Sequence, residues 1–208
     1  MPRGTNAPKL CPADPLKCRR IVSSGSPSGP CRRVNSQPSI VPTTRFVLRI
    51  GNVAETVERA IESVRSTLEL KDIELILDVP YDLPPVHHDT DAITQCIVNL
   101  VSNAAKYSPG GSRVRLHGRV VEGVELTISD EGIGIAAHDL RKIFDPFYRS
   151  RDSLARRQKG TGIGLTITRY IIEAHGGSIS VQSRPGKGST FTLRFPNEPT
   201  PPPARGTI

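Results

Sequence analysis

The spacing of apolar residues changes repeatedly between residues 45 and 196. In some stretches apolar positions recur every three to four residues, as on one side of a helix, and in others they alternate or form short runs, as in strands. The expected strands are 46–50, 73–79, 113–121, 124–129 and a hairpin over 178–195, and the expected helices are 52–70, 95–108, 137–144 and 162–174. This order predicts an α/β fold, a two-layer α/β sandwich whose mixed sheet carries helices on one face.

The helix around 95–108 has an apolar side and a polar side. The apolar side is formed by Ile93, Ile97, Leu100 and Ala104. Asn99, Asn103 and Lys106 share a different face. Asparagine is a mediocre helix former, so two of them in mid-helix indicate another role. Carboxamide oxygens suit a hard cation such as Mg²⁺ and an ammonium suits a phosphate, while a plain solvated face is the alternative. Asp89 or Thr90 is expected to cap this helix.

Asp130 is expected to end a strand and to open the first of the glycine-rich segments DEGIGI, KGTGIGLT and PGKGSTF. A carboxylate there can accept a hydrogen bond from the adenine amine, whereas guanine presents a carbonyl oxygen and is repelled. A hydrogen bond to a charged group contributes about 1.5–3 kcal/mol, enough for about tenfold or greater selectivity. Gly132 and Gly134 would let the backbone pass close to the base. A plain turn is the alternative.

The second glycine segment, KGTGIGLT, is not one of the common phosphate-binding loops. It follows the basic stretch SRDSLARRQ rather than a strand, it lacks the spacing of a dinucleotide fingerprint, and its glycines are not followed by Lys-Ser or Lys-Thr as in a Walker A loop. The HRD and DFG motifs of protein kinases are also missing from the sequence. The segment leads into the N-terminus of an expected helix, whose N–H groups can hold phosphates.

These three segments, together with KIFDPFYR at 142–149 and the asparagine-bearing helix, occur in an order that resembles the ATP-binding catalytic domain of bacterial sensor histidine kinases. That family belongs to a larger group of ATPases that includes gyrase and the Hsp90 chaperones. The resemblance covers roughly residues 45–196. It implies the Bergerat, or GHKL ATPase, fold, ATP and Mg²⁺ as cofactors, and transfer of the γ-phosphoryl group of ATP to a histidine.

The resemblance also implies roles for single residues. Asn99, Asn103 and Lys106 would be catalytic: Asn103 would hold Mg²⁺, Asn99 would assist, and Lys106 would meet phosphate. Tyr107 would pack near adenine, and the hydroxyl of Thr190 would support the adenine-binding aspartate. The residues expected to bind ATP are Asn99, Asn103, Lys106, Tyr107, Asp130, Gly132, Ile133, Gly134, Arg149, Lys159, Gly160, Thr161, Gly162, Ile163, Gly164, Leu165 and Thr190.

By the same resemblance, the segment 148–160 would be a lid over the nucleotide, mobile until the nucleotide binds. Its positive charges are Arg149, Arg151, Arg156, Arg157 and Lys159. One or two of these would touch phosphate. Phe144 and Phe147 match the aromatic box that precedes the lid, where a role as the lid's hydrophobic anchor fits as well as a catalytic one.

The histidines bear on what the chain can do alone. The five are His87, His88, His117, His138 and His175. None stands in a context like S-H-E-L-R-T-P, which marks the phospho-acceptor of a sensor kinase. We therefore expect the acceptor on a partner dimerisation domain in trans, with a response regulator as an indirect partner, or else a chain that is a fragment. A non-catalytic ATP-binding regulatory module and an anti-sigma-type serine kinase are the alternative functions.

Charge and composition separate the two ends from this domain. Residues 1–44 contain eight prolines, and their seven lysines and arginines against Asp14 alone account for +6 of the net charge of +8. We therefore expect a disordered leader over 1–44, a folded domain over 45–196 and a disordered proline-rich tail over 197–208. Because the folded part is nearly neutral, no nucleic-acid partner is expected. The sequence has neither a signal peptide nor a stretch long enough to span a membrane, which favours a cytoplasmic location with reduced cysteines.

Overall fold

In the computed structural model, residues 45–150 and 160–197 are described, and all of them belong to one structural unit, Ser39–Ile208. The expected leader, Lys159, the middle of the expected lid and residues 198–208 lie outside the described residues. The helices are α1 (Val53–Leu70), α2 (Thr90–Tyr107), α3 (Ala137–Leu140) and α5 (Gly164–Ala174). The strands are β1 (Arg49–Gly51), β2 (Glu74–Asp78), β3 (Val86–His88), β4 (Arg113–Val120), β5 (Gly123–Asp130), β6 (Ser178–Ser183) and β7 (Ser189–Pro196).

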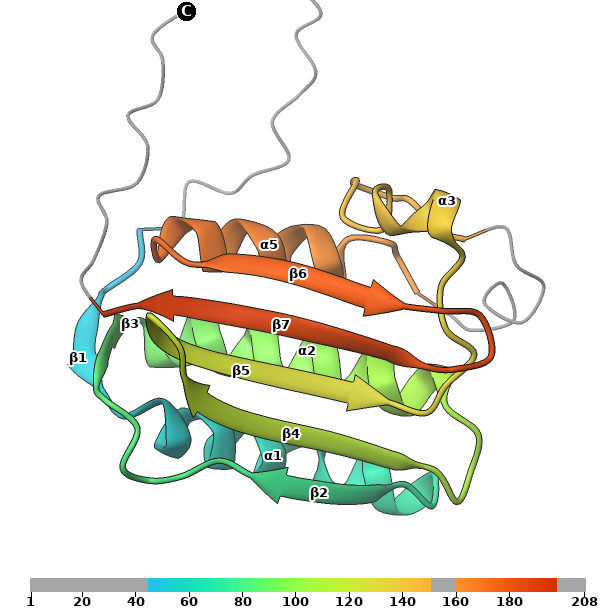
Figure 1. Ribbon diagram of the computed structural model, residues 1–208, viewed down its shortest axis with the longest axis horizontal. Coiled ribbons are helices and arrows are strands. Elements are labelled where there is room, and N and C mark those ends of the chain that lie inside the picture. Colours follow the sequence, from blue (N-terminus) through green and yellow to red (C-terminus); the bar gives the residue numbers. More distant parts are fainter. Residues whose placement is uncertain (1–44, 151–159, 198–208) are drawn as a thin grey trace, which may run out of the picture. The chain divides into compact units, whose positions relative to one another are not determined.

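A mixed sheet of five strands forms one layer, in the order β2-β4-β5-β7-β6 (Figure 1). Strands β2 and β4 are parallel, and the other neighbouring pairs are antiparallel. The central strand β5 is therefore hydrogen-bonded on both sides, and its last residue, Asp130, lies at the end of the sheet opposite the β4–β5 turn. Strands β1 and β3 form a separate antiparallel pair.

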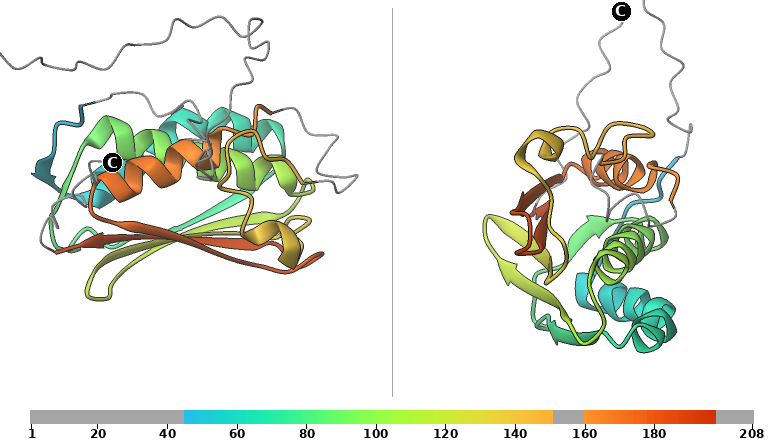
Figure 2. Two further views of the ribbon diagram at one scale, coloured as in Figure 1. Left: turned by 90° about the horizontal axis from the view of Figure 1, so that it is seen from above. Right: turned by 90° about the vertical axis from the view of Figure 1, so that its right-hand side faces the viewer.

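Helices α1, α2 and α5 form the second layer and cover one face of this sheet (Figure 2). Helix α2 lies between α1 and α5 and contacts both. Its apolar side is fully buried, since Ile93, Ile97 and Leu100 are at most 1% exposed. The sheet contributes alternate residues to the same core, such as Leu126 and Leu193, both 0% exposed. The predicted two-layer α/β sandwich with helices on one face is confirmed.

Asp89 is the N-cap of α2, one of the two residues expected in that role. Its side chain accepts from the N–H of Ala92 at 3.1 Å and from the N–H of Val47 at 2.9 Å. Burial raises the pKa of Asp89, but these hydrogen bonds outweigh burial and the pKa is lowered. Asp91 lies in the first turn and Lys106 in the last, where each sign of charge complements the helix dipole.

Three expected boundaries were wrong, and one strand was not expected. The strand at 46–50 begins only at Arg49, because Phe46 instead packs in a tilted arrangement against the rings of Tyr170 and His175. Strand β3 was not expected, because three residues next to prolines carry almost no pattern. Helix α3 ends at Leu140 rather than at 144, and residues 141–147 form hydrogen-bonded turns. Helix α5 begins at Gly164, two residues late, since Gly162 has a positive φ of 73° that a helix does not allow.

Across the described ranges, no helix is both long and apolar enough to cross a membrane.

Candidate functional site

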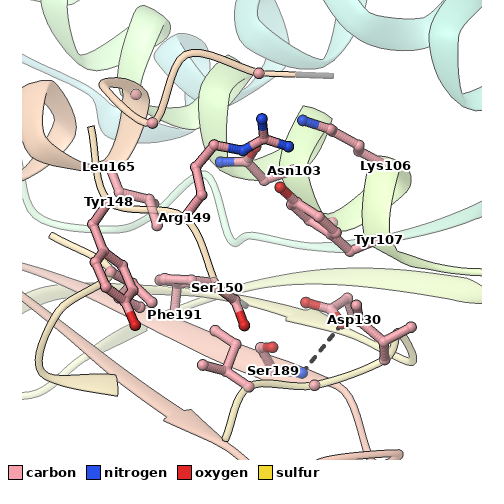
Figure 3. A pocket seen from close by; sticks show the side chains of 18 of the residues that line it. Asn103, Lys106, Tyr107, Asp130, Tyr148, Arg149, Ser150, Leu165, Ser189 and Phe191 are labelled. Carbon is pink, nitrogen blue, oxygen red and sulfur yellow. Dashed lines mark hydrogen bonds between the residues drawn. The ribbon is translucent and has the colours of Figure 1, made fainter. Parts of the chain in front are cut away.

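A cavity of about 290 Å³ lies between the C-terminal half of α2, the end of β5 and the segments that flank α3 and α5. Figure 3 shows its walls: Asn103, Lys106 and Tyr107 come from α2, and Asp130 and Ser189 lie on the opposite side. Thirteen of the residues expected to bind ATP line it, namely Asn99, Asn103, Lys106, Tyr107, Asp130, Ile133, Gly134, Arg149, Gly160, Thr161, Gly162, Gly164 and Leu165. The structure thus brings together residues that are more than sixty positions apart.

The two asparagines of α2 differ in their surroundings. Asn99 donates from Nδ2 to Thr168 Oγ1 of α5 at 2.9 Å, which fixes the orientation of its amide. A Cβ at Gly164 would lie 2.4 Å from Asn99 Oδ1, so only glycine lets the start of α5 approach this side chain so closely. Neither Asn99 Oδ1 nor the Asn103 side chain hydrogen-bonds to another residue in the described ranges. Both half-buried amides thus retain acceptor oxygens in the lining of the cavity.

Asp130 is held by two backbone N–H groups. Its Oδ1 atom accepts from Gly132 N at 2.9 Å and from Ser189 N at 3.2 Å, the second of which is drawn in Figure 3. Its Oδ2 atom makes no hydrogen bond within the described part of the chain. Burial raises the pKa of Asp130 above its usual value, although the two N–H groups act in the opposite direction. A half-buried carboxylate oxygen therefore remains available to a donor in the cavity.

The floor beside Asp130 is made of two glycine-rich loops in backbone contact. Gly186 N donates to Ile133 O at 2.7 Å, across the cavity floor. Gly188 has a φ of +77°, and a Cβ there would lie only 1.8 Å from the carbonyl oxygen of Asp130. Both the backbone conformation and the contact therefore require glycine at this position. Gly186 and Gly188 of the third glycine segment thus shape the site through their backbone.

Positive charge gathers at the other end of the cavity. Lys106 lies over the ring of Tyr107, with Nζ 5.0 Å from the ring centroid, and Arg149 reaches toward the same corner (Figure 3). Burial first, and then the charge of Arg149, lower the pKa of Lys106. Burial raises the pKa of Tyr107. A Cβ on Gly160 would lie 2.8 Å from Lys106 Nζ, so the chain leading to α5 passes directly beside this ammonium. Such a corner suits an anion.

Four residues expected to bind ATP do not line the cavity. Gly132 bonds to Asp130 but is not part of the lining, Ile163 at the N-cap of α5 is not part of it either, and Lys159 lies outside the described residues. The expectation for Thr190 was wrong: its hydroxyl hydrogen-bonds to Ser129 Oγ at 2.9 Å, and the N–H of Ser189 supports the aspartate instead. Thr190 faces away because successive residues of a strand point to opposite faces, and Phe191 faces inward.

The two phenylalanines of the aromatic box have different environments. Phe144 is buried, at 8% exposure, and belongs to the core, as expected for an anchor. Phe147 is 60% exposed with a positive φ of 61°, so it anchors nothing within the described residues. Its backbone N–H nevertheless donates to Gly162 O at 3.0 Å, which ties the segment before the expected lid to the segment after it.

Sequence reasoning missed nine lining residues: Ala104, Ile135, Ala136, Ile143, Tyr148, Ser150, Pro185, Ser189 and Phe191. The alternation Phe191, Leu193, Phe195 in the sequence could have placed Ser189 and Phe191 on the inward face. Tyr148 and Ser150 flank Arg149 in a segment without regular secondary structure, where no periodicity marks a face.

The donor set fits a purine nucleotide with a hard cation. The open Oδ2 atom of Asp130 suits an amine, and the basic corner suits phosphates. No cluster of three or more His, Cys, Asp or Glu side chains that could hold a metal occurs among the residues described. A cation here would be held by the amide oxygens of Asn99 and Asn103 and by the ligand's own oxygens, which are donors that Mg²⁺ accepts.

Comparison with known proteins gives a consistent result. A family model described as histidine kinase-, DNA gyrase B-, and HSP90-like ATPase matches residues 88–199. The adaptive-response sensory kinase SasA of Synechococcus sp. (strain JA-3-3Ab) is 41% identical over 69% of this chain, and the sensor histidine kinase WalK of Bacillus subtilis (strain 168) is 39% identical over 75%. The alignments span only 38% and 24% of those proteins.

Solved structures agree with these sequence matches. The mycobacterial sensor histidine kinase MprB superimposes with a TM-score of 0.63 at 29% identity, covering 74% of this chain and 100% of that chain. The catalytic domain of histidine kinase ThkA gives a TM-score of 0.64 at 26% identity, covering 74% and 98%.

Proposed function

Since this chain belongs to the histidine kinase-, DNA gyrase B-, and HSP90-like ATPase family, we propose that its cavity binds Mg·ATP and that the domain transfers the γ-phosphoryl group to a histidine of a partner dimerisation domain. The observation that carries this proposal is Asp130, a half-buried carboxylate fixed by two backbone N–H groups, with its second oxygen open to the cavity.

The adenine end of the cavity would be defined by Asp130 and its floor. Asp130 Oδ2 would accept from the exocyclic amine, and the two glycine loops in backbone contact would lie beside the ring. Tyr107 and Phe191 line the same cavity and offer apolar faces. A guanine would place a carbonyl oxygen against the carboxylate, so this end selects adenine.

The phosphate end would be formed by α2, Arg149 and the start of α5. Lys106 and Arg149 would neutralise negative charge on the phosphates. The first N–H groups of α5, at the helix N-terminus beside Asn99, would donate to phosphate oxygens. The amide oxygens of Asn99 and Asn103 would hold Mg²⁺, which would neutralise charge on the phosphates. The chain's own residues thus act by binding, orientation and charge neutralisation.

The acceptor histidine would come from another chain. All five histidines lie in the described residues and none lines the cavity. His88 and His175 are buried in the core, with exposures of 1% and 3%. Phosphoryl transfer requires reacting atoms about 3–3.5 Å apart and in line. Since none of these side chains lines the cavity, none is placed for such a contact. A response regulator would receive the group afterwards, and the cytoplasm would supply the ATP.

A transfer assay tests this function. The chain, MgATP labelled on the γ-phosphate and a separately produced dimerisation domain with its acceptor histidine are incubated together. We expect acid-labile, base-stable label on the dimerisation domain, little label on the chain itself, and loss of transfer in Asn103→Ala. A chain that binds ATP yet labels no such domain would be a non-catalytic binding module. An acid-stable product would indicate a serine kinase, and strong labelling of the lone chain would refute transfer in trans.

A further inference from the structure

Asp139 has a buried carboxylate that plays no part in the cavity lining described above. It belongs to α3, it is 1% exposed, and it does not line the cavity. Its Oδ1 atom accepts from the hydroxyl of Tyr148 at 2.5 Å, and its Oδ2 atom accepts from the hydroxyl of Ser150, also at 2.5 Å. His138 Nε2 lies 3.2 Å from Oδ1. A buried carboxylate is costly unless it is hydrogen-bonded, so this side chain holds its partners firmly.

The two hydroxyl groups that Asp139 holds flank Arg149. Because both neighbours of Arg149 bond to one buried carboxylate, the backbone of residues 148–150 is held at two points. This restricts the direction in which the Arg149 side chain leaves the backbone. Figure 3 shows this arrangement: Tyr148 and Ser150 point one way, and Arg149 turns toward Asn103 and the corner of Lys106 and Tyr107.

Arg149 lies close enough to that corner to act on its electrostatics. Burial is the larger cause of the lowered pKa of Lys106 and of the raised pKa of Tyr107, and the charge of Arg149 adds to the first shift and opposes the second. A long, partly exposed arginine on a segment without regular secondary structure has many rotamers, and ordering it costs free energy unless its backbone is fixed beforehand. The Asp139 carboxylate supplies that fixation from a turn of α3 whose own backbone is tied through Lys142 N to Asp139 O at 2.7 Å.

We infer that Asp139 is a positioning residue that aims Arg149 at the phosphates of the nucleotide, through its bonds to Tyr148 and Ser150. The inference rests on the proposed function, because it needs a triphosphate in the cavity. It assigns a specific effect: Asp139 controls how strongly the site prefers ATP to adenosine and leaves recognition of the base to Asp130.

The test measures ATP and adenosine affinities by calorimetry, with Mg²⁺ present, for the full chain and its variants. In Asp139→Ala we expect ATP binding to weaken about tenfold and adenosine binding to stay within about twofold, because only the phosphate contact is lost. Asp139→Asn keeps one acceptor and gains a donor that Ser150 can accept, so it should recover part of the loss. Asp145→Asn removes the same charge from an exposed side chain of the same segment and should match the wild type.

A double-mutant cycle separates positioning from a general structural role. In an Arg149→Ala background, Asp139→Ala should have no further effect on the ratio of the two affinities. Equal weakening of ATP and adenosine, additive effects of the two substitutions, or an Arg149→Ala protein that binds ATP normally would each overturn the inference. Should Asp139→Ala unfold, the double variant Tyr148→Phe with Ser150→Ala carries the same expectations. A wild-type chain that binds neither ligand would refute the proposed function instead.

Discussion

Replacing Asp130 by asparagine should change which base the cavity accepts, because the native carboxylate has one oxygen engaged and one open. Oδ1 accepts from the N–H groups of Gly132 and Ser189 at 2.9 and 3.2 Å. An asparagine that keeps both bonds places its oxygen there and its NH₂ group where Oδ2 now lies. The NH₂ group of the asparagine would then face the 6-amino group of adenine, and two donors cannot form a hydrogen bond. A purine with a carbonyl group at C6 would instead accept a hydrogen bond from this NH₂ group.

The size of the effect follows from these bonds. A hydrogen bond to a charged acceptor contributes about 1.5–3 kcal/mol, so ATP affinity should fall about 10- to 150-fold. The opposite orientation of the amide would give up two backbone bonds worth about 1 kcal/mol each, which disfavours it. Inosine triphosphate has the carbonyl group and lacks the 2-amino group of guanine, so its affinity relative to ATP should rise in Asp130→Asn.

Calorimetry of the wild type and Asp130→Asn with each nucleotide measures this exchange, and thermal unfolding checks that the variant is folded. Asp78→Asn is the matched control, since that aspartate is exposed on β2 and bonds only to His117 among the described residues. Unchanged ATP affinity, or equal loss of both nucleotides in a folded variant, would refute the reasoning.

Three further predictions concern charged and buried groups. Burial raises the pKa of Asp130, so its carboxylate should be protonated, and ATP affinity should fall, at a pH above the value of about 3.9 that is usual for aspartate. Calorimetry in a pH series should show this fall in affinity in the wild type and not in Asp130→Asn. Glu125 is 1% exposed and accepts from Arg194 and Arg119, so Glu125→Ala should lower the free energy of unfolding by about 1–3 kcal/mol in urea titrations. Hydrogen bonding to Arg194, and then to Arg119, lowers the pKa of Glu125 in the folded protein. The stabilisation is therefore present above the pKa that Glu125 has in the unfolded chain, and it is lost as the pH falls through the lower pKa of the folded state. A destabilisation by Glu125→Ala that grew on acidification would contradict this. Burial raises the pKa of Cys96 to about 12, so its thiol should resist alkylation in the folded protein near pH 8, as peptide mapping would show. The free energy of unfolding should also fall above the unfolded thiol's pKa of about 8.5, because only the unfolded chain ionises there. Rapid labelling under native conditions would refute this burial.

The parts of the fold that carry a long periodic pattern were predictable. The buried side of α2 and the alternating strands β4, β5 and β7 follow from the sequence because burial of one face imposes a period. Strand β3 could not be predicted, since its three residues pair with β1 through contacts that no local pattern records. The later start of the first strand has the same origin. Phe46 packs against the rings of Tyr170 and His175, which lie more than 120 positions away in the sequence.

The candidate site divides in a similar way. Asp130 and the glycine segments were recognisable because a carboxylate at a strand end and glycines at close contacts have few substitutes. Thr190 was misassigned by one residue, and one residue in a strand reverses the face. The cluster around Asp139 was invisible because its partners lie nine and eleven positions away, in turns, and meet only through tertiary structure.

The bond from Ser189 N to Asp130 also has a consequence for when the cavity can exist during synthesis. The two residues are 59 positions apart, and β7, which carries Ser189, is the last strand among the described residues. A nascent chain that has emerged as far as Ala174 already contains Asn103, Lys106 and Asp130, yet it lacks the floor that fixes the aspartate. Strand β6 emerges next, but its only neighbour in the main sheet is β7, so β6 cannot pair before β7 is present. Closure of such long-range pairs comes late in folding. The floor that fixes Asp130 can therefore form only after β7 has been synthesised and has left the ribosome.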